Sequence, residues 1–161
     1  MAGHSDNDMA LPRFEAPVHA AIIIAPYYTA IANAQLASAR AVLDSAGATH
    51  ETIEVPGSLE IPTAVSMAEN SGGFDAFVAL GCVIRGRTSH YDVVVNESAR
   101  GLMLLGLEGL CIGNGIITVE NRAQADERAD AARLDTAGGA ATAALHLVAL
   151  SRRFSAEQDR A

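Results

Sequence analysis

Four short apolar runs, each followed by a segment of helical character, constrain the fold of this chain more than any other feature. The first run, VHAAIIIA at residues 18–25, is almost unbroken, as in a strand that is covered on both faces. Residues 29–46 then carry apolar side chains at helical spacing and end before Gly47, a residue type common at helix C-termini. The alternation predicts strands at 18–25, 49–55, 74–84 and 109–119, and helices at 29–46, after Ser58, at 93–106, from Asn121 to Arg128 and at 140–154.

Two of the predicted helices begin with recognisable capping residues. Ser58 precedes the second helix, which has Pro62 in its first turn, so we expect Ser58 to be its N-cap. Asn121, followed by Gln124 three residues later, resembles a capping box for the fourth helix. The small residues DTAGG at 135–139 predict a break before the last helix.

Strands that alternate with helices pair in parallel, through right-handed crossovers that place helices on both faces of the sheet. The pattern therefore predicts an α/β fold with a four-stranded parallel sheet. A chain of 161 residues has the size of one domain with a single core. We expect a flexible N-terminal arm at residues 1–17, one domain at 18–154 and a C-terminal tail at 155–161.

The composition excludes several classes of function. A formal net charge of −8 argues against a nucleic-acid partner, because phosphates are neutralised by clustered Lys and Arg. The eleven basic residues are all arginines, which excludes a Schiff base on an enzyme lysine and a P-loop lysine. Half of the residues are apolar, so we expect part of the apolar surface to be buried between subunits.

The two cysteines indicate neither a metal site nor a redox site. Cys82 and Cys111 fall in apolar runs and belong to no set with metal-ligand spacing, so we expect reduced core residues and no bound metal. No apolar segment reaches the roughly 18 residues of a membrane span, and residues 1–17 lack a signal-peptide pattern. We therefore expect a cytoplasmic protein that has no membrane partner.

Polar stretches follow each predicted strand, at the edge where ligands of parallel α/β sheets bind. They are PYYT at 26–29, VPGSLE at 55–60, RGRTSH at 85–90 and TVENRAQADER at 118–128. His90 is the residue best suited to move protons, because an unperturbed histidine has a pKa of about 6.5. A surface-loop histidine is the ordinary alternative, but the flanking Arg87, Thr88, Ser89 and Asp92 favour a site.

The remaining candidates each have a structural alternative. Residues 85–90 offer consecutive backbone N–H groups for an anion, and Arg128 could fold back over the same edge to grip it. The alternative for Arg128 is a surface ion pair with Asp126 or Glu127. Tyr27 and Tyr28 could stack on a planar ring or simply pack at a helix start. For the acids Glu60 and Glu97, a solvated helix face is the favoured interpretation.

Three stretches together resemble the lumazine synthase family, the 6,7-dimethyl-8-ribityllumazine synthases of riboflavin biosynthesis. They are VPGSLEIP at 55–62, LGCVIRGRTSHYDVVVNES at 80–98 and GNGIITVENRAQADERA at 113–129. The resemblance covers about residues 18 to 154, and its middle stretch is specific to the family. It implies a three-layer α/β/α sandwich of flavodoxin-like type, assembled as a homopentamer with active sites between subunits.

The resemblance also implies a reaction that uses no cofactor and no metal. In it, 5-amino-6-ribitylaminouracil condenses with 3,4-dihydroxy-2-butanone 4-phosphate, and inorganic phosphate and water are released. By position, His90 would move protons, while Arg128 and the backbone at Arg87 and Thr88 would hold the phosphate. The other implied contacts are Tyr27 stacked on the pyrimidine, Ser58, Leu59 and Glu60 at the ribityl chain, Cys82, Val83 and Ile84 at the ring pocket, and Asn114 across the subunit boundary.

Departures from the family pattern leave two alternatives open. Pro26 replaces an arginine common before the strand-one aromatic, and Asn114 stands where many members carry an aromatic residue. Both departures allow a non-catalytic relative that binds a flavin or lumazine, although a proton shuttle beside a phosphate clamp argues for the enzyme. A signalling receiver domain would need acids after the first strand and a lysine, which the chain lacks. DAARLDTAGG at 130–139 differs from the lysine-containing linker of shell-forming members, which favours an isolated pentamer over a 60-subunit shell.

Overall fold

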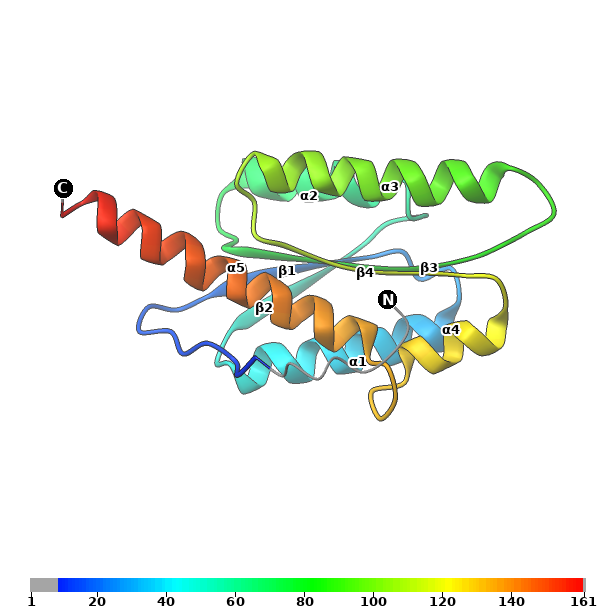
Figure 1. Cartoon of the computed structure of the whole chain (residues 1–161), viewed down its shortest axis with the longest axis horizontal. Helices are drawn as coiled ribbons and strands as arrows, with labels where there is room; N and C mark the ends of the chain where they lie inside the picture. Colours follow the sequence, from blue (N-terminus) through cyan, green and yellow to red (C-terminus); the bar gives the residue numbers. More distant parts are fainter. Residues whose placement is uncertain (1–8, 161) are drawn as a thin grey trace.

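The computed structural model describes residues 9–160 and arranges them as a parallel sheet between two helical layers (Figure 1). This confirms the predicted α/β class and its flavodoxin-like, three-layer arrangement. No helix in the described range is long and apolar enough to cross a membrane. The elements are β1 His19–Ile24, α1 Thr29–Ser45, β2 Thr49–Glu54, α2 Ile61–Ser71, β3 Ala76–Ile84, α3 His90–Leu107, β4 Ile112–Val119, α4 Arg122–Ala129 and α5 Thr136–Gln158.

The four strands run parallel in the order β2-β1-β3-β4. Residues 20–24 of β1 pair with 76–80 of β3, and residues 77–84 of β3 pair with 112–119 of β4. The connection from β1 leads outward to β2, whereas the chain returns on the other side of β1 to form β3. The order therefore reverses between β1 and β3, and such a switch point opens a crevice beyond the carboxyl ends of the two strands.

Each face of the sheet has its own hydrophobic layer. Helices α1, α4 and α5 cover one face, and α2 and α3 cover the other (Figure 1). Because side chains alternate along a strand, Ile22 and Ile24 pack into the first layer and Ile23 into the second. All three are fully buried, as the unbroken apolar run of β1 predicts.

Helix α5 lies unusually close to β4 because two glycines of β4 carry no side chain there. A Cβ built on Gly113 would overlap with the carbonyl oxygen of Ala140 in α5. A Cβ on Gly115 would lie 3.1 Å from the Cβ of Ala140 and 2.8 Å from Leu80. The α5 backbone therefore packs directly against the sheet.

Two predicted helix starts are wrong. Glu60, not Ser58, is the N-cap residue of α2, and no side chain caps that helix. The predicted break at 135–139 is instead the first turn of α5, because the Asp135 side chain accepts a hydrogen bond from Gly138 N. Asp135 has a φ of 40° and also accepts a hydrogen bond from Ser38 of α1.

The observed starts of α3 and α4 agree better with the sequence prediction. Helix α3 begins at His90, three residues before the predicted start at residue 93. The capping residue of α4 is confirmed, since Asn121 accepts from Gln124 N. The Gln124 side chain accepts from Glu120 N, one residue earlier than a standard capping box requires.

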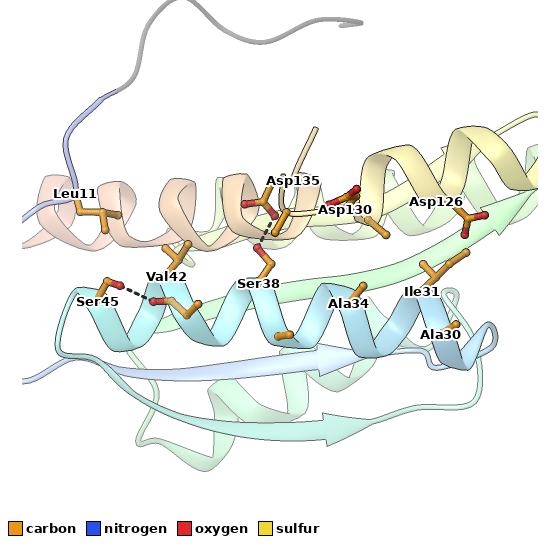
Figure 2. A pocket seen from close by; sticks show the side chains of 14 residues that line it. Leu11, Ala30, Ile31, Ala34, Ser38, Val42, Ser45, Asp126, Asp130 and Asp135 are labelled. Atoms are coloured by element: carbon orange, nitrogen blue, oxygen red, sulfur yellow. Dashed lines mark hydrogen bonds between the residues drawn. The ribbon is translucent and has the colours of Figure 1, made fainter. Parts of the chain in front are cut away.

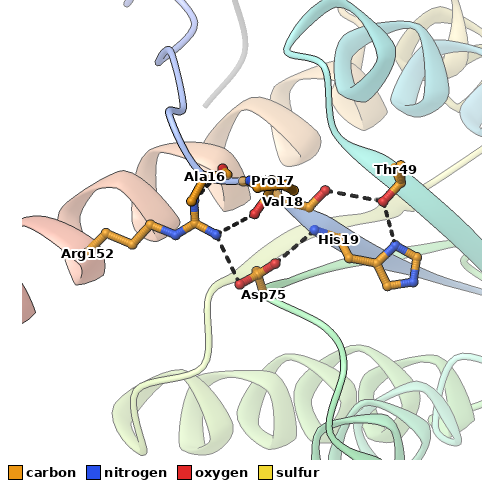
Figure 3. A network of polar contacts seen from close by, with 7 residues as sticks. All are labelled: Ala16, Pro17, Val18, His19, Thr49, Asp75 and Arg152. Carbon is orange, nitrogen blue, oxygen red and sulfur yellow. Dashed lines mark hydrogen bonds and ion pairs between the residues drawn. The ribbon is translucent and has the colours of Figure 1, made fainter.

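A polar network ties the start of the domain to its last helix (Figure 3). Arg152 of α5 donates to the carbonyl oxygens of Ala16 and Pro17 and pairs with Asp75, which precedes β3. Asp75 also accepts from the backbone N of His19 at 2.8 Å. Residues 1–8 of the predicted arm lie outside the described residues, and α5 continues to Gln158, past the predicted start of the tail. The division into arm, domain and tail stays a prediction.

Candidate active site

The turns after β1 and β2 meet the end of β3 around Gly81. A Cβ built on Gly81 would lie 2.9 Å from Ser58 Oγ, 3.4 Å from Ile61 Cδ1 and 3.8 Å from Ala25 Cβ. Only a glycine lets these groups approach so closely. The structure thus brings Ser58 to the β1–β3 switch point, where it is buried.

The other two residues of the predicted ribityl-binding turn differ in exposure. Leu59 is half-buried, whereas Glu60 is exposed at the start of α2. The Glu60 carboxylate folds back over Gly57, where a Cβ would lie 2.9 Å from Oε2. The turn at 57–60 therefore carries a buried hydroxyl and an exposed carboxylate, two groups that can accept hydrogen bonds from a polyol.

The last residues of β3 do not point into one pocket. Cys82 and Ile84 pack with Tyr28 and Ile31 on the α1 side of the sheet, and the strand alternation turns Val83 to the opposite face. Burial raises the pKa of the Cys82 thiol to about 11, so the thiol is neutral near pH 7. Cys82, Val83 and Ile84 therefore follow one another along the strand, but their side chains do not face one common pocket.

The segment between β3 and α3 is exposed and ends at the N-terminus of α3. Arg87, Thr88 and His90 are all exposed there, and His90 N lies 3.4 Å from the Thr88 hydroxyl oxygen that accepts its hydrogen bond. Within residues 9–160, no side chain hydrogen-bonds to the His90 ring. The positive end of an 18-residue helix faces this edge, which favours an anion beside the histidine.

The two adjacent tyrosines have different roles. Tyr27 is 75% exposed and leaves a ring available at the edge, whereas Tyr28 is half-buried and packs against the layer around Ile31. Their rings contact each other edge to face at 5.0 Å. Desolvation raises the pKa of Tyr28, in keeping with its packed position. The structure therefore separates a candidate stacking residue from a structural one.

Arg85 is the side chain at this edge whose contacts sequence reasoning missed. Its Nε lies 2.9 Å from a Glu120 carboxylate oxygen, and its Nη1 lies 3.1 Å from Asp92 Oδ1. Its guanidinium also lies 4.0 Å from the centre of the Tyr91 ring. Hydrogen bonding to Glu120, more than to Asp92, raises the pKa of Arg85. The sequence does contain a signal for this ion pair: two residues of opposite charge, Arg85 and Glu120, each directly follow one of two paired strands.

Within its own chain, Arg128 lies away from the segment between β3 and α3. It lies near the end of α4, on the α1 side of the sheet, and donates to the Gln124 carbonyl at 3.2 Å. Figure 1 shows α4 starting at the carboxyl edge and running back beneath the sheet. Arg128 is in the last turn of α4, so within its own chain it does not fold over the edge as predicted.

The acids expected as alternative partners of Arg128 are taken by other arginines. Asp126 pairs with Arg122, and Glu127 pairs with Arg133. Asn114 also lies away from the loop, exposed on the edge strand β4, with its side chain accepting from Ile116 N. In a single chain, Arg128 and Asn114 therefore stand apart from His90.

A cavity of about 650 Å³ lies elsewhere, between α1 and the segment from α4 to α5 (Figure 2). Its lining includes Ile31 and Val42 with Asp126, Asp130 and Asp135. The carboxylates make this wall unsuitable for a phosphate ester. Among the described residues, no cluster of three or more His, Cys, Asp or Glu side chains could hold a metal ion.

Comparisons with known proteins point to one family. A family model described as 6,7-dimethyl-8-ribityllumazine synthase matches residues 17–152. A protein of that name from Jannaschia sp. (strain CCS1) is 70% identical over 97% of this chain and 88% of its own length. Another from Sphingopyxis alaskensis is 54% identical over 84% and 96%, and a 6,7-dimethyl-8-ribityllumazine synthase 1 from Rhizobium meliloti is 50% identical over 88% and 97%. The chain belongs to the 6,7-dimethyl-8-ribityllumazine synthase family.

Proposed function

We propose that the carboxyl edge between β1 and β3 is the place where this transferase of riboflavin biosynthesis condenses its two substrates. The substrates are 5-amino-6-ribitylaminouracil and 3,4-dihydroxy-2-butanone 4-phosphate, and phosphate and water leave. The observation that carries the proposal is that the exposed His90, at the N-terminus of α3, follows the carboxyl end of β3, the strand whose Gly81 lies against the Ser58 hydroxyl. The chemistry requires a proton shuttle, an anion site and a polyol site, which these groups can supply.

The aminouracil is held by residues that lie before and after this switch point. Tyr27 stacks on the pyrimidine ring, and Ser58, Leu59 and Glu60 bind the ribityl chain. The backbone of Cys82, Val83 and Ile84 borders the ring, because only one of their three side chains faces the α2–α3 layer. The nitrogen that attacks the ketone comes from the aminouracil, which is consistent with a chain that has no lysine.

His90 acts as the general acid and base. An imidazole donates and accepts protons near neutral pH, as imine formation and loss of phosphate both require. The backbone at Arg87 and Thr88 and the N-terminus of α3 hold the phosphate group of the butanone phosphate.

Arg128 and Asn114 are supplied to this site by a second copy of the chain. Two observations support this arrangement: Arg128 lies on the α1 side of its own sheet, and the acids beside it are paired with other arginines. A guanidinium without a carboxylate partner among residues 9–160 can still bind a phosphate bidentately. Each site then lies between two subunits.

A homopentamer is the assembly that we propose, without further closure into a 60-subunit shell. The apolar outer face of the α2–α3 layer supports self-association. Met67, Met103, Leu104 and Leu107 are all more than half exposed there, and Leu107 is 78% exposed. The linker at 130–139 supports the isolated pentamer, as its sequence differs from that of shell-forming members.

We also propose a cytoplasmic location. Both cysteines of the chain are free and buried, as expected for a protein that folds in a reducing compartment.

The test is an absorbance and fluorescence assay of the purified protein with both substrates, compared with their spontaneous condensation. His90→Ala should slow turnover by about 10²–10³. Arg128→Ala should cost roughly 1.5–3 kcal/mol, seen as a KM for the butanone phosphate raised about tenfold to 150-fold. Arg153→Ala, an exposed arginine of α5, is the control and should change neither value.

Two results would contradict the proposal. A His90→Ala variant with wild-type turnover would remove the histidine from the mechanism. Binding of lumazine or riboflavin by the wild type, with no rate above the spontaneous one, would favour a binding protein without catalysis.

A further inference from the structure

Arg85 is an arginine of the candidate active site whose guanidinium is already paired with two carboxylates. It follows directly on β3, and its backbone N donates to Val119 O at 2.9 Å, next to the last pair of the β3–β4 ladder. Its side chain pairs with Glu120, the first residue after β4, and with Asp92 in the first turn of α3. With two carboxylates bound, this arginine is a poor ligand for a substrate phosphate.

The contacts of Arg85 join three pieces of backbone that meet at the edge. Glu120 is itself held by Gln124 of α4, whose side chain accepts from Glu120 N at 2.9 Å. Tyr91 and Asp92, the two residues that follow His90, contact the same guanidinium through its face and through Nη1. A planar guanidinium can serve a ring and two carboxylates at once, which an ammonium group cannot do.

The position of His90 depends on this arrangement. The described residues offer its ring no hydrogen-bond partner, and its backbone N makes only a long bond of 3.4 Å to Thr88 Oγ1. The side chain of Ser89, the N-cap residue of α3, accepts no capping hydrogen bond from the first turn. Arg85 therefore ties Tyr91 and Asp92, in the first turn of α3, to the ends of β3 and β4.

We propose that Arg85 is a positioning residue, which holds the first turn of α3 against the ends of β3 and β4 and thereby aims His90 at the reacting atoms. The inference rests on the proposed function, because it assigns His90 the proton transfers. Displacement of a catalytic group by about 1 Å can cost a factor of about 100 in rate. Arg85 touches no substrate in this proposal, so its loss should act on turnover and not on substrate binding.

The experiment measures kcat and KM for wild type, Arg85→Gln, Arg85→Lys and the control Arg100→Gln. Arg100 pairs with Glu97 on the same helix and makes no contact with the edge. Arg85→Gln should lower kcat about tenfold to 100-fold and leave KM for the butanone phosphate within about twofold. Arg85→Lys should recover only part of this loss, and Arg100→Gln should lose nothing.

A double variant separates positioning from a general structural effect. If Arg85 acts through His90, Arg85→Gln should cause no further loss in a His90→Ala background. Multiplied losses in the double variant would overturn the proposal, as would a raised KM with unchanged kcat. Should Arg85→Gln fail to fold, Asp92→Ala and Glu120→Ala each remove one contact and should show the same pattern with smaller losses.

A readout without substrate keeps this inference distinct from the proposed function. Amide hydrogen exchange in residues 90–93 should be faster in Arg85→Gln than in wild type or Arg100→Gln. Unchanged exchange in that turn would overturn the positioning role even in an active enzyme. If exchange rises but wild type forms no product, the proposed function fails while the mechanical role of Arg85 stands.

Discussion

Ser58, in the turn after β2, lies directly against Gly81 of β3 beside the candidate site. Ser58 was expected to cap a helix, but its hydroxyl is instead placed over Gly81 of β3. A serine before a helix pattern does indicate a cap, since its hydroxyl often bonds to the first turn. Here the close approach of two chain segments decides its position, and a one-dimensional pattern does not contain such a contact.

Gly81→Ala should weaken binding of the ribitylaminouracil. The new Cβ would lie 2.9 Å from Ser58 Oγ, so the hydroxyl must move away from its present position. We expect KM for this substrate to rise about tenfold, equal to about 1.4 kcal/mol, with little change in KM for the butanone phosphate. Adding Ser58→Gly removes the overlap and should restore the stability lost in urea unfolding, but not KM. Recovery of KM in that double variant would exclude a role of Ser58 in binding.

His90 and Arg85 differ in how much of their position and function could be predicted from the sequence. The location of His90 at the edge was predictable, because a polar stretch after a buried strand must lie at a carboxyl end. The function of Arg85 was not, because its partners Glu120 and Asp92 are 35 and 7 residues away along the chain. The position of Arg128 within its own chain likewise depends on how α4 packs against the sheet, which the sequence pattern does not contain.

At the scale of the elements, the contact between α5 and β4 depends on side chains that are absent. Gly113 and Gly115 face α5, and neither leaves room for a Cβ beside Ala140. Sequence reasoning found both partners of this contact, since the strand and the helix have strong apolar patterns. It delayed the start of α5 to residue 140, because Gly138 and Gly139 have low helix propensity. The Asp135 cap and the packing on α1 override that propensity.

Gly113→Ala should destabilise the fold. Its Cβ would overlap with a backbone carbonyl of α5, which cannot turn aside as a side chain can, so we expect a loss of about 3 kcal/mol. Gly139→Ala is the matched control: it is one residue before Ala140, with nothing within 4 Å of its new Cβ. The control should gain about 0.5–1 kcal/mol from helix propensity. Urea unfolding midpoints compare the two, and equal stability of both variants would contradict the tight contact.

At the scale of the whole molecule, the sequence was sufficient to predict the class of fold and the edge of the sheet where the candidate site residues from His90 to Ser58 lie. Both follow from the alternation of buried strands and helices, which leaves few topologies open. The assembly depends on how exposed side chains fit another surface, and periodicity within one chain carries little of that information. The apolar face of α2 and α3 is where the described residues point to such a partner.

Leu107→Glu should dissociate the proposed homopentamer. Leu107 is 78% exposed at the end of α3, and a carboxylate there would be buried without a partner in a subunit interface. We expect smaller particles in sedimentation velocity and lower activity, since Arg128 would no longer reach a neighbouring site. Phe154→Glu, on the opposite helical layer, is the control and should leave the assembly intact. An unchanged sedimentation coefficient for Leu107→Glu would exclude this face as the interface.

The direction of α5 has a practical consequence for engineering. Figure 1 shows its last turns projecting beyond the sheet at the end opposite to the β3–α3 connection. The hydrogen bonds from Arg152 to the carbonyl oxygens of Ala16 and Pro17 help to hold the helix in that direction. A reporter or cargo domain fused behind Gln158 would therefore be carried away from the proposed active site of the same chain. Fusion at this end is the design that leaves turnover undisturbed.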